Sequence, residues 1–88
     1  MNTWSVYILR CRDTSLYTGI STNVENRINV HNQGKGAAYT RSRLPVLLLW
    51  QEDNLTESVA RKREAEIKRW KKEEKEKFIK SCVQKQEK

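Results

Sequence analysis

Two short segments near the start of the chain limit its fold more than any other feature. Residues 3–10 and 15–20 are rich in the β-branched and aromatic side chains that favour strands. The residues between them, 11–14, are polar and typical of a turn. The pattern therefore predicts a β-hairpin.

A helix is expected directly after this hairpin. Thr22 and Glu25 have the spacing of a capping box, in which the hydroxyl accepts a hydrogen bond from the backbone amide three residues on. The helix would extend over residues 23–32 and end before Gly34. Residues 34–43 are expected to form a loop, because their glycines allow tight turns.

One more strand and a helical last third complete the expected elements. Pro45 precedes a strand over 46–50, whose unbroken apolar character predicts burial on both faces. Thr56 is positioned to cap a helix, and a further helix follows it. The apolar positions of these helices are Val59, Ala60, Ile67, Trp70, Phe78 and Ile79. The predicted fold class is therefore α+β, with a small three-stranded, mostly antiparallel sheet flanked by helices in the order β-β-α-β-α-α.

Length and composition restrict the class of protein. The 88 residues are expected to form a single domain over 1–88, with a core over 3–80 and a basic helical tail. No apolar run approaches the ~20 residues that span a membrane, and no signal peptide is expected. Two cysteines and one histidine exclude a structural zinc cluster, so a reduced, cytoplasmic protein is expected.

The chain carries a net charge of +7, and most of the excess lies in its last third. A basic surface raises the expectation of a polyanionic partner, because neutralising phosphates releases counterions. Lysines also serve solubility, so the charge by itself leaves nucleic-acid binding open. The lysine run over 71–88 is equally consistent with a solvated helix face.

Tyrosines in both strands of the hairpin are candidate site residues. If the hairpin loop has an odd number of residues, Tyr7 and Tyr17 lie directly opposite one another, with both hydroxyls on one face and able to share a ligand. Gly19, two residues after Tyr17, would leave open space on that face for a ligand to reach the backbone. Tyrosines in strands are also common packing residues, and that alternative stays open here.

The first helix adds two polar candidates. Arg27 and His31 are spaced i, i+4 and share one helix face, beside the Val24 and Ile28 stripe that would face the core. They would therefore lie where the helix meets the sheet. Alternatively, Arg27 forms a surface ion pair, and His31 is a cation that interacts with the helix dipole.

Two glutamates of the long helix are candidate metal ligands. Glu64 and Glu66 lie on opposite sides of its apolar stripe, and the periodicity does not choose between them. A carboxylate at the rim of a buried face can hold Mg²⁺, which takes few protein ligands and keeps its waters. Alternatively, both are solvated partners of Lys62, Arg63 or Lys68, and this is the expected state of Glu66.

The combined pattern resembles the GIY-YIG nuclease superfamily, in particular its small stand-alone bacterial members, over residues 3–80. The matching segments are 6–11, 15–21, 24–27, 31–32, 34–41 and 63–69. Two positions depart from the family motifs: Ser5 replaces the first glycine, and Thr18 stands where the second motif has isoleucine. Thr18 is expected to face away from the tyrosines, so neither change touches a side chain that the mechanism uses.

The resemblance implies hydrolysis of a DNA phosphodiester with one divalent metal ion, Mg²⁺ or Mn²⁺. Tyr7 and Tyr17 match the tyrosines of the two motifs, and Arg27 matches the arginine that contacts the scissile phosphate. Glu64, which precedes the Ala-x-Ile-Lys segment, matches the single metal-binding glutamate. His31 matches a histidine found near the tyrosines. Branched or damaged DNA, in repair or recombination, is the expected substrate class.

DNA contacts are expected from the glycine-containing loop. Lys35, Tyr39, Arg41 and Arg43 combine positive charge with a stacking surface, which suits a DNA backbone and unpaired bases. A protein partner would supply specificity, since many nucleases of the family use a further domain for it. Two alternatives remain: a catalytically weak DNA-binding module and a protein-interaction module.

Overall fold

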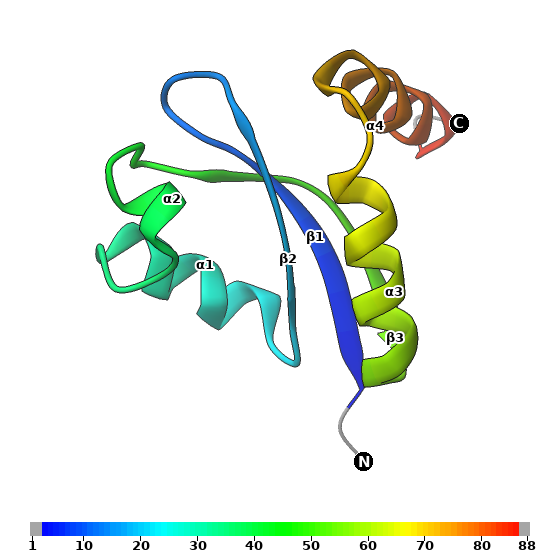
Figure 1. Cartoon of the computed structure of the whole chain (residues 1–88), viewed down its shortest axis with the longest axis horizontal. Coiled ribbons are helices and arrows are strands. Elements are labelled where there is room, and N and C mark those ends of the chain that lie inside the picture. The colour runs from blue at the N-terminus through cyan, green and yellow to red at the C-terminus, as the bar shows by residue number, and fades with distance from the viewer. Residues whose placement is uncertain (1–2, 87–88) are drawn as a thin grey trace.

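The computed structural model describes residues 3–86, with side chains up to residue 82, and these residues fold around a three-stranded sheet (Figure 1). In chain order the elements are β1 (Trp4–Arg10), β2 (Leu16–Ser21), α1 (Val24–Asn32), α2 (Ala38–Arg41), β3 (Leu47–Leu55), α3 (Glu57–Lys68) and α4 (Lys72–Gln86). The strand order is β2-β1-β3, and both pairings are antiparallel. The predicted α+β class and order of elements are confirmed, and the segment expected to be a loop contains the short helix α2. None of the described helices is both long and apolar enough to cross a membrane.

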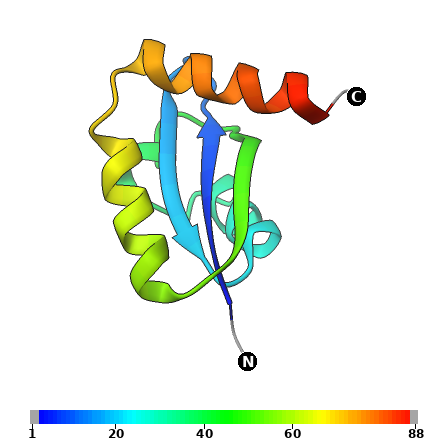
Figure 2. The same ribbon diagram turned by 90° about the vertical axis from the view of Figure 1, so that its right-hand side faces the viewer.

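Helices cover both faces of the sheet (Figure 2). α1 and α2 lie on one face, and α3 and α4 lie on the other. Because β1 is the central strand, its side chains are buried alternately on the two sides. Val6 and Ile8 pack with Ile67 of α3, whereas Tyr7 and Leu9 belong to the cluster on the α1 side.

The third strand is longer and more exposed than the sequence predicts. β3 lies at the edge of the sheet, and Leu47 and Leu48 are 65% and 41% exposed. The prediction that residues 46–50 are buried on both faces is therefore wrong, although Val46 itself is buried. An unbroken apolar run is typical of a central strand, but β1 takes that position here. β3 has a neighbouring strand on one side only, which leaves part of its apolar surface in solvent.

Side-chain caps begin α1 and α3. Asn23 accepts a hydrogen bond from the Asn26 amide at 3.0 Å and so caps α1. The predicted capping box at Thr22 is wrong by one residue, because Asn23 has both the extended backbone and the side-chain oxygen that a cap needs. Thr56 caps α3 as predicted, accepting from the Val59 amide at 3.2 Å.

α3 packs on the sheet through a narrow stripe. Ala60 and Ile67 are fully buried, two turns apart on one helix face. Val59 is 48% exposed, so its predicted place on the buried face is wrong; it lies about 100° around the helix from Ala60. Trp70 follows the helix and packs edge-to-face on Phe78 of α4, with ring centroids 5.2 Å apart.

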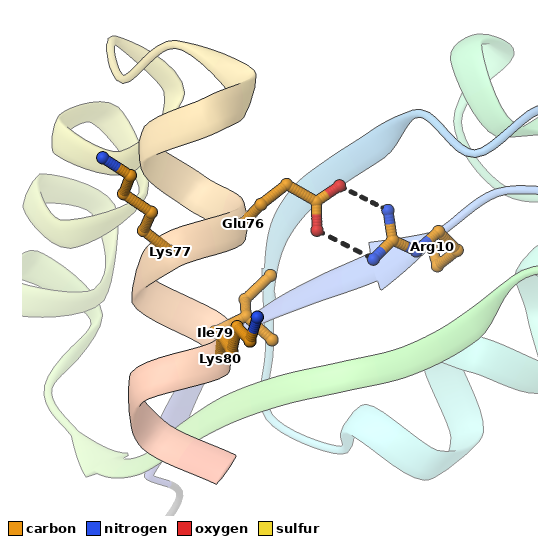
Figure 3. Close-up of a pocket in the computed structure, with 5 residues that line it drawn as sticks. All are labelled: Arg10, Glu76, Lys77, Ile79 and Lys80. Atoms are coloured by element: carbon orange, nitrogen blue, oxygen red, sulfur yellow. Dashed lines mark hydrogen bonds and ion pairs between the residues drawn. The ribbon is translucent and has the colours of Figure 1, made fainter. Parts of the chain in front are cut away.

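An ion pair as well as apolar contacts fixes α4 to the sheet (Figure 3). Arg10, at the end of β1, donates a hydrogen bond to each oxygen of the Glu76 carboxylate, one of them at 2.8 Å. These bonds hold the pKa of Glu76 below its usual range, and Ile79 is buried one turn further along the helix. The two-point contact therefore ties the last helix to the central strand.

Candidate active site

Tyr7 and Tyr17 lie on the same face of the sheet, but they are not opposite one another. Tyr7 pairs with Gly19, and Leu9 pairs with Tyr17, so the two tyrosines are diagonal neighbours. The predicted direct pairing is therefore wrong by two residues, whereas the predicted shared face is confirmed.

The hairpin turn sets this register. The Cys11 amide donates to the Ser15 carbonyl at 2.9 Å, and Asp13 between them accepts hydrogen bonds from the Ser15 amide and hydroxyl. Thr14 takes up a left-handed conformation, with a φ of 71°. The connection between the strands has an odd number of residues, as the direct pairing of Tyr7 with Tyr17 requires. Its central residue is Asp13, however, whereas that pairing requires Arg12 at the centre. This difference of one residue at the centre shifts every cross-strand pairing by two.

Gly19 gives room to the Tyr7 ring rather than to a ligand. A Cβ atom at Gly19 would lie 2.5 Å from Tyr7 Oη and 2.7 Å from Tyr7 Cζ, so the ring lies directly across the glycine. The predicted open space beside the tyrosines is therefore filled by Tyr7 itself. Thr18 faces away from the tyrosines, as expected, because strand side chains alternate between the two faces.

His31 is fully buried near the end of α1 and binds the Tyr7 hydroxyl. Its Nε2 lies 3.1 Å from Tyr7 Oη, and its Nδ1 lies 2.8 Å from Thr40 Oγ1. The Thr40 hydroxyl donates its one proton to the Ala37 carbonyl at 3.0 Å, so it accepts from His31. This network assigns the His31 proton to Nδ1, and Nε2 accepts a hydrogen bond from the Tyr7 hydroxyl.

The environment of His31 favours its neutral form. Burial, and to a lesser extent the nearby Arg27 guanidinium, lower its pKa. The Gly36 backbone lies against the ring, since a Cβ atom there would overlap His31 Nδ1. The alternative that His31 is a cation interacting with the helix dipole is therefore not supported, since the ring is buried and its pKa is lowered.

Burial raises the pKa of Tyr7 to about 12. The adjacent Arg27 lowers this pKa in part, whereas Tyr17 and Glu64 raise it through the charge of their ionised forms. The Tyr7 hydroxyl is therefore protonated at neutral pH, and a free phenolate at pH 7 would cost about 7 kcal/mol. In the free protein Tyr7 is a hydrogen-bond donor rather than a preformed base.

The charges of two side chains from different elements act on this hydroxyl. Arg27, which is half-buried, reaches it from α1, and Glu64 of α3 is close enough for its charge to act on it. The Glu64 side chain is 21% exposed, and its carboxylate lies 3.2 Å from the Lys68 ammonium. Glu66 is more exposed and pairs with an arginine of the same helix, as expected for the solvated member of the two.

The residues expected to bind DNA fall into two groups. The Tyr39 ring stacks on Tyr17 with centroids 6.0 Å apart, and the Arg43 guanidinium lies 4.0 Å from the Tyr39 centroid. Arg43 also pairs with an aspartate of the hairpin turn at 3.0 Å. Lys35 and Arg41 are exposed on the segment from α1 to α2. The structure therefore brings Tyr39 and Arg43 to the tyrosine cluster, but not Lys35 and Arg41.

Three further residues belong to the surroundings of the cluster, and the sequence does not predict them as site residues. Thr40 fixes the tautomer of His31. The sequence does not predict this contact, because the segment that contains Thr40 has no helical periodicity that would place it beside His31. Lys68 and Lys75 line a pocket beside the second tyrosine. The i, i+4 spacing from Glu64 points to Lys68, whereas nothing in the sequence distinguishes Lys75 from its neighbouring lysines.

The donor set fits a hard divalent cation held by few protein ligands. Within the described residues, no three or more His, Cys, Asp and Glu side chains gather in a way that could hold a metal ion. Glu64 offers one carboxylate, which lies 3.2 Å from the Lys68 ammonium and whose charge acts on Tyr7. A cation such as Mg²⁺, bound through one carboxylate with water and phosphate oxygens completing its shell, suits this arrangement.

The family model described as the GIY-YIG catalytic domain matches residues 3–78. The chain belongs to the GIY-YIG family. Nucleases of this family generally use divalent metal ions.

More particularly, the chain is similar to small bacterial proteins designated UPF0213. It is 54% identical over 74 residues to UPF0213 protein SH2523 of Staphylococcus haemolyticus, which covers 84% of this chain and 90% of the relative. A UPF0213 protein of Staphylococcus aureus is 48% identical over 80 residues, covering 91% of this chain and 98% of the relative. The names of these relatives state no activity.

Two solution NMR structures share the fold. The UPF0213 protein BH0048 from Bacillus halodurans has a TM-score of 0.58 and 40% sequence identity, covering 89% of this chain and 83% of that one. The protein EF2693 from E. faecalis has a TM-score of 0.63 and 36% identity, covering 94% and 88%. Both likenesses extend over most of the sheet and its helices, so they support the architecture that holds the site.

Proposed function

We propose that this protein is a metal-dependent DNA endonuclease that hydrolyses phosphodiester bonds at the cluster of Tyr7, Arg27, His31 and Glu64. Its membership of the GIY-YIG family supports a nuclease activity. The observation that carries the proposal is the buried hydrogen bond between Tyr7 Oη and His31 Nε2, on which the charges of Arg27 and Glu64 act. Titratable groups with perturbed pKa values that converge from separate elements are typical of active sites.

The buried hydrogen bonds support a route for activating water. A water molecule beside Tyr7 would give its proton to Tyr7 Oη while Tyr7 passes its own proton to His31 Nε2. This transfer forms an imidazolium instead of a free phenolate. Burial disfavours both ions, but the ordinary pKa of His31, 6.5, lies much closer to neutrality than the Tyr7 pKa of about 12. Thr40 accepts from Nδ1 and so keeps Nε2 free to receive the proton. The hydroxide then attacks phosphorus, and the bond to the departing oxygen breaks.

Arg27 is the residue we assign to the phosphate. A guanidinium presents parallel donors that match two phosphate oxygens, and its charge offsets the negative charge that builds up in the transition state. Mg²⁺ or Mn²⁺ held by Glu64 would supply Lewis-acid stabilisation of the departing oxygen. Tyr17, whose ring centroid lies 5.4 Å from that of His31, is the second hydroxyl able to orient the water.

Branched or damaged DNA is the substrate class we propose, with a protein partner supplying specificity in repair or recombination. Lys35 and Arg41 are exposed basic residues suited to the DNA backbone, and contacts of that kind read shape rather than sequence. The net charge of +7 favours binding to DNA, which is a polyanion. Cys11 and Cys82 are free thiols, which agrees with a reducing cytoplasm.

A DNA-binding module with negligible turnover is the second candidate function. The ion pair between Lys68 and Glu64 favours it, because a carboxylate with a partner inside the protein binds a metal ion less readily. This function predicts salt-sensitive DNA binding that requires neither Glu64 nor a metal ion.

Cleavage of a panel of labelled DNA substrates tests the proposal. The panel contains duplex, single strand, flap, three-way junction and four-way junction, each with Mg²⁺, Mn²⁺ or chelator. The wild-type protein is expected to cut at least one of these with metal, and Glu64→Gln is expected to lower the rate about 100-fold or more. Glu66→Gln removes an exposed carboxylate from the same helix and should keep the rate within about twofold.

The matched variants separate the possible outcomes. Cutting by Glu64→Gln at the wild-type rate would contradict the assignment of Glu64 and point to a contaminating nuclease. Absence of cutting, with DNA binding retained by all three proteins, would favour the binding module. Absence of both cutting and binding would favour a protein-interaction module.

A further inference from the structure

A pocket of about 400 Å³ lies next to Tyr17, on the outer strand of the sheet. Its walls combine two lysines, two tyrosine rings and a short stretch of β2. The lining residues are Leu16, Tyr17, Thr18, Tyr39, Lys68 and Lys75. Four elements, β2, α2, α3 and α4, therefore meet at this pocket.

Lys75 differs from the other lysines of α4. It is half-buried, whereas Lys72, Lys77 and Lys80 are exposed. Burial and the charge of the nearby Lys68 lower its pKa. No carboxylate among the described side chains forms an ion pair with Lys75. A half-buried ammonium group without a counter-charge is unfavourable, and a bound anion relieves it.

Lys68 joins this pocket to the candidate active site. Its ammonium lies 3.2 Å from the Glu64 carboxylate and 5.9 Å from the centroid of the Tyr17 ring. Lys68 and Lys75 together carry two positive charges, and Glu64 neutralises one of them. The pocket therefore keeps a net positive charge, carried by Lys75.

We propose that this pocket binds a phosphodiester group of the DNA strand, next to the phosphate that Arg27 would hold. Lys68 and Lys75 bind its oxygens, and the stacked rings of Tyr17 and Tyr39 form the wall beside the adjoining sugar or base. The inference rests on the proposed function, because the ligand is part of the same DNA. It distinguishes Lys75 from the exposed lysines of the same helix, Lys72, Lys77 and Lys80.

Equilibrium binding of DNA in the presence of chelator tests the pocket separately from catalysis. Fluorescence anisotropy measures Kd for a labelled single strand and a labelled duplex at several salt concentrations. Lys75→Gln is expected to weaken binding about 5- to 10-fold and to reduce the slope of log K against log salt by about 0.7–0.9. Lys77→Gln removes the same charge from an exposed position of the same helix. It should weaken binding less than about twofold.

A charge-retaining variant controls for loss of structure. Lys75→Arg should bind DNA within about threefold of the wild type, because the pocket uses the positive charge. If Lys75→Arg is folded, as thermal melting shows, and binds as weakly as Lys75→Gln, the proposal is overturned. Equal losses in Lys75→Gln and Lys77→Gln also overturn it, but leave the proposed function standing, since the wild type still binds and cuts. Failure of the wild type to bind any DNA overturns both.

Discussion

At the scale of single residues, three hydrogen bonds in series determine how a proton moves at the candidate site. Tyr7 donates to His31, His31 donates to Thr40, and Thr40 donates to the Ala37 carbonyl. The last bond sets the direction of the others, because a backbone carbonyl only accepts. His31 is therefore held in the tautomer whose free Nε2 faces the Tyr7 hydroxyl.

Thr40 is accordingly a positioning residue, and its replacement should act through His31. Thr40→Val removes the acceptor at Nδ1 with little change of shape. We expect cleavage to fall about 10- to 100-fold and the Nε2-protonated tautomer to become populated, which ¹⁵N–¹H NMR spectra of the ring detect. Thr40→Ser keeps the hydroxyl and should restore both properties. An unchanged tautomer in Thr40→Val would contradict this role, whatever the rate.

At the scale of elements, the start of α1 matters to the site, because Arg27 and His31 project from this helix. Asn23 caps it through the Asn26 amide. Asn23→Ala should lower the free energy of unfolding by about 1 kcal/mol, since one helix amide loses its partner. Thr22→Ala, at the exposed position before the cap, should change it by less than about 0.5 kcal/mol. Denaturant unfolding of both variants measures the difference, and equal losses would show that the cap is not Asn23.

Composition and periodicity predicted the described helices and strands except α2, but not how these elements meet. The hairpin register depends on Asp13, whose carboxylate bonds Ser15, and a polar loop does not reveal which residue lies at its centre. The apolar run of β3 is typical of a central strand, yet the position of a strand in a sheet depends on its neighbours. α2 has four residues, which is too short for helical periodicity to show.

The same distinction applies to the candidate site. Tyr7, Tyr17 and Arg27 were predictable because they belong to short motifs in the hairpin and the first helix. The choice of Glu64 as their partner came from the family resemblance, because the periodicity of the long helix did not distinguish Glu64 from Glu66. Lys75 was not predictable, because only tertiary packing separates it from the exposed lysines beside it.

At the scale of the whole molecule, the response to pH near neutrality depends on a single histidine. The chain contains one histidine, His31, which is fully buried, and burial lowers its pKa. In the unfolded chain its pKa returns to the ordinary value of 6.5. Below that pH the unfolded state binds a proton that the folded state does not, so acid shifts the equilibrium toward unfolding. This contribution to stability is complete above the unfolded pKa and is lost as the pH falls toward the folded one.

The free energy of unfolding should therefore decrease as the pH is lowered from about 7 to about 5, before carboxylates contribute. Glu76, whose pKa is lowered by Arg10, loses its contribution only below its ordinary value of 4.5. Denaturant unfolding at a series of pH values measures the first decrease, and His31→Gln should abolish it. NMR titration of the ring gives the folded pKa directly. A constant stability over this range would mean that His31 binds its proton equally well in both states, and Nε2 would then be half protonated near pH 6.5. Since a protonated Nε2 does not accept from Tyr7, the proton route proposed for catalysis would then be lost progressively as the pH falls below about 6.5.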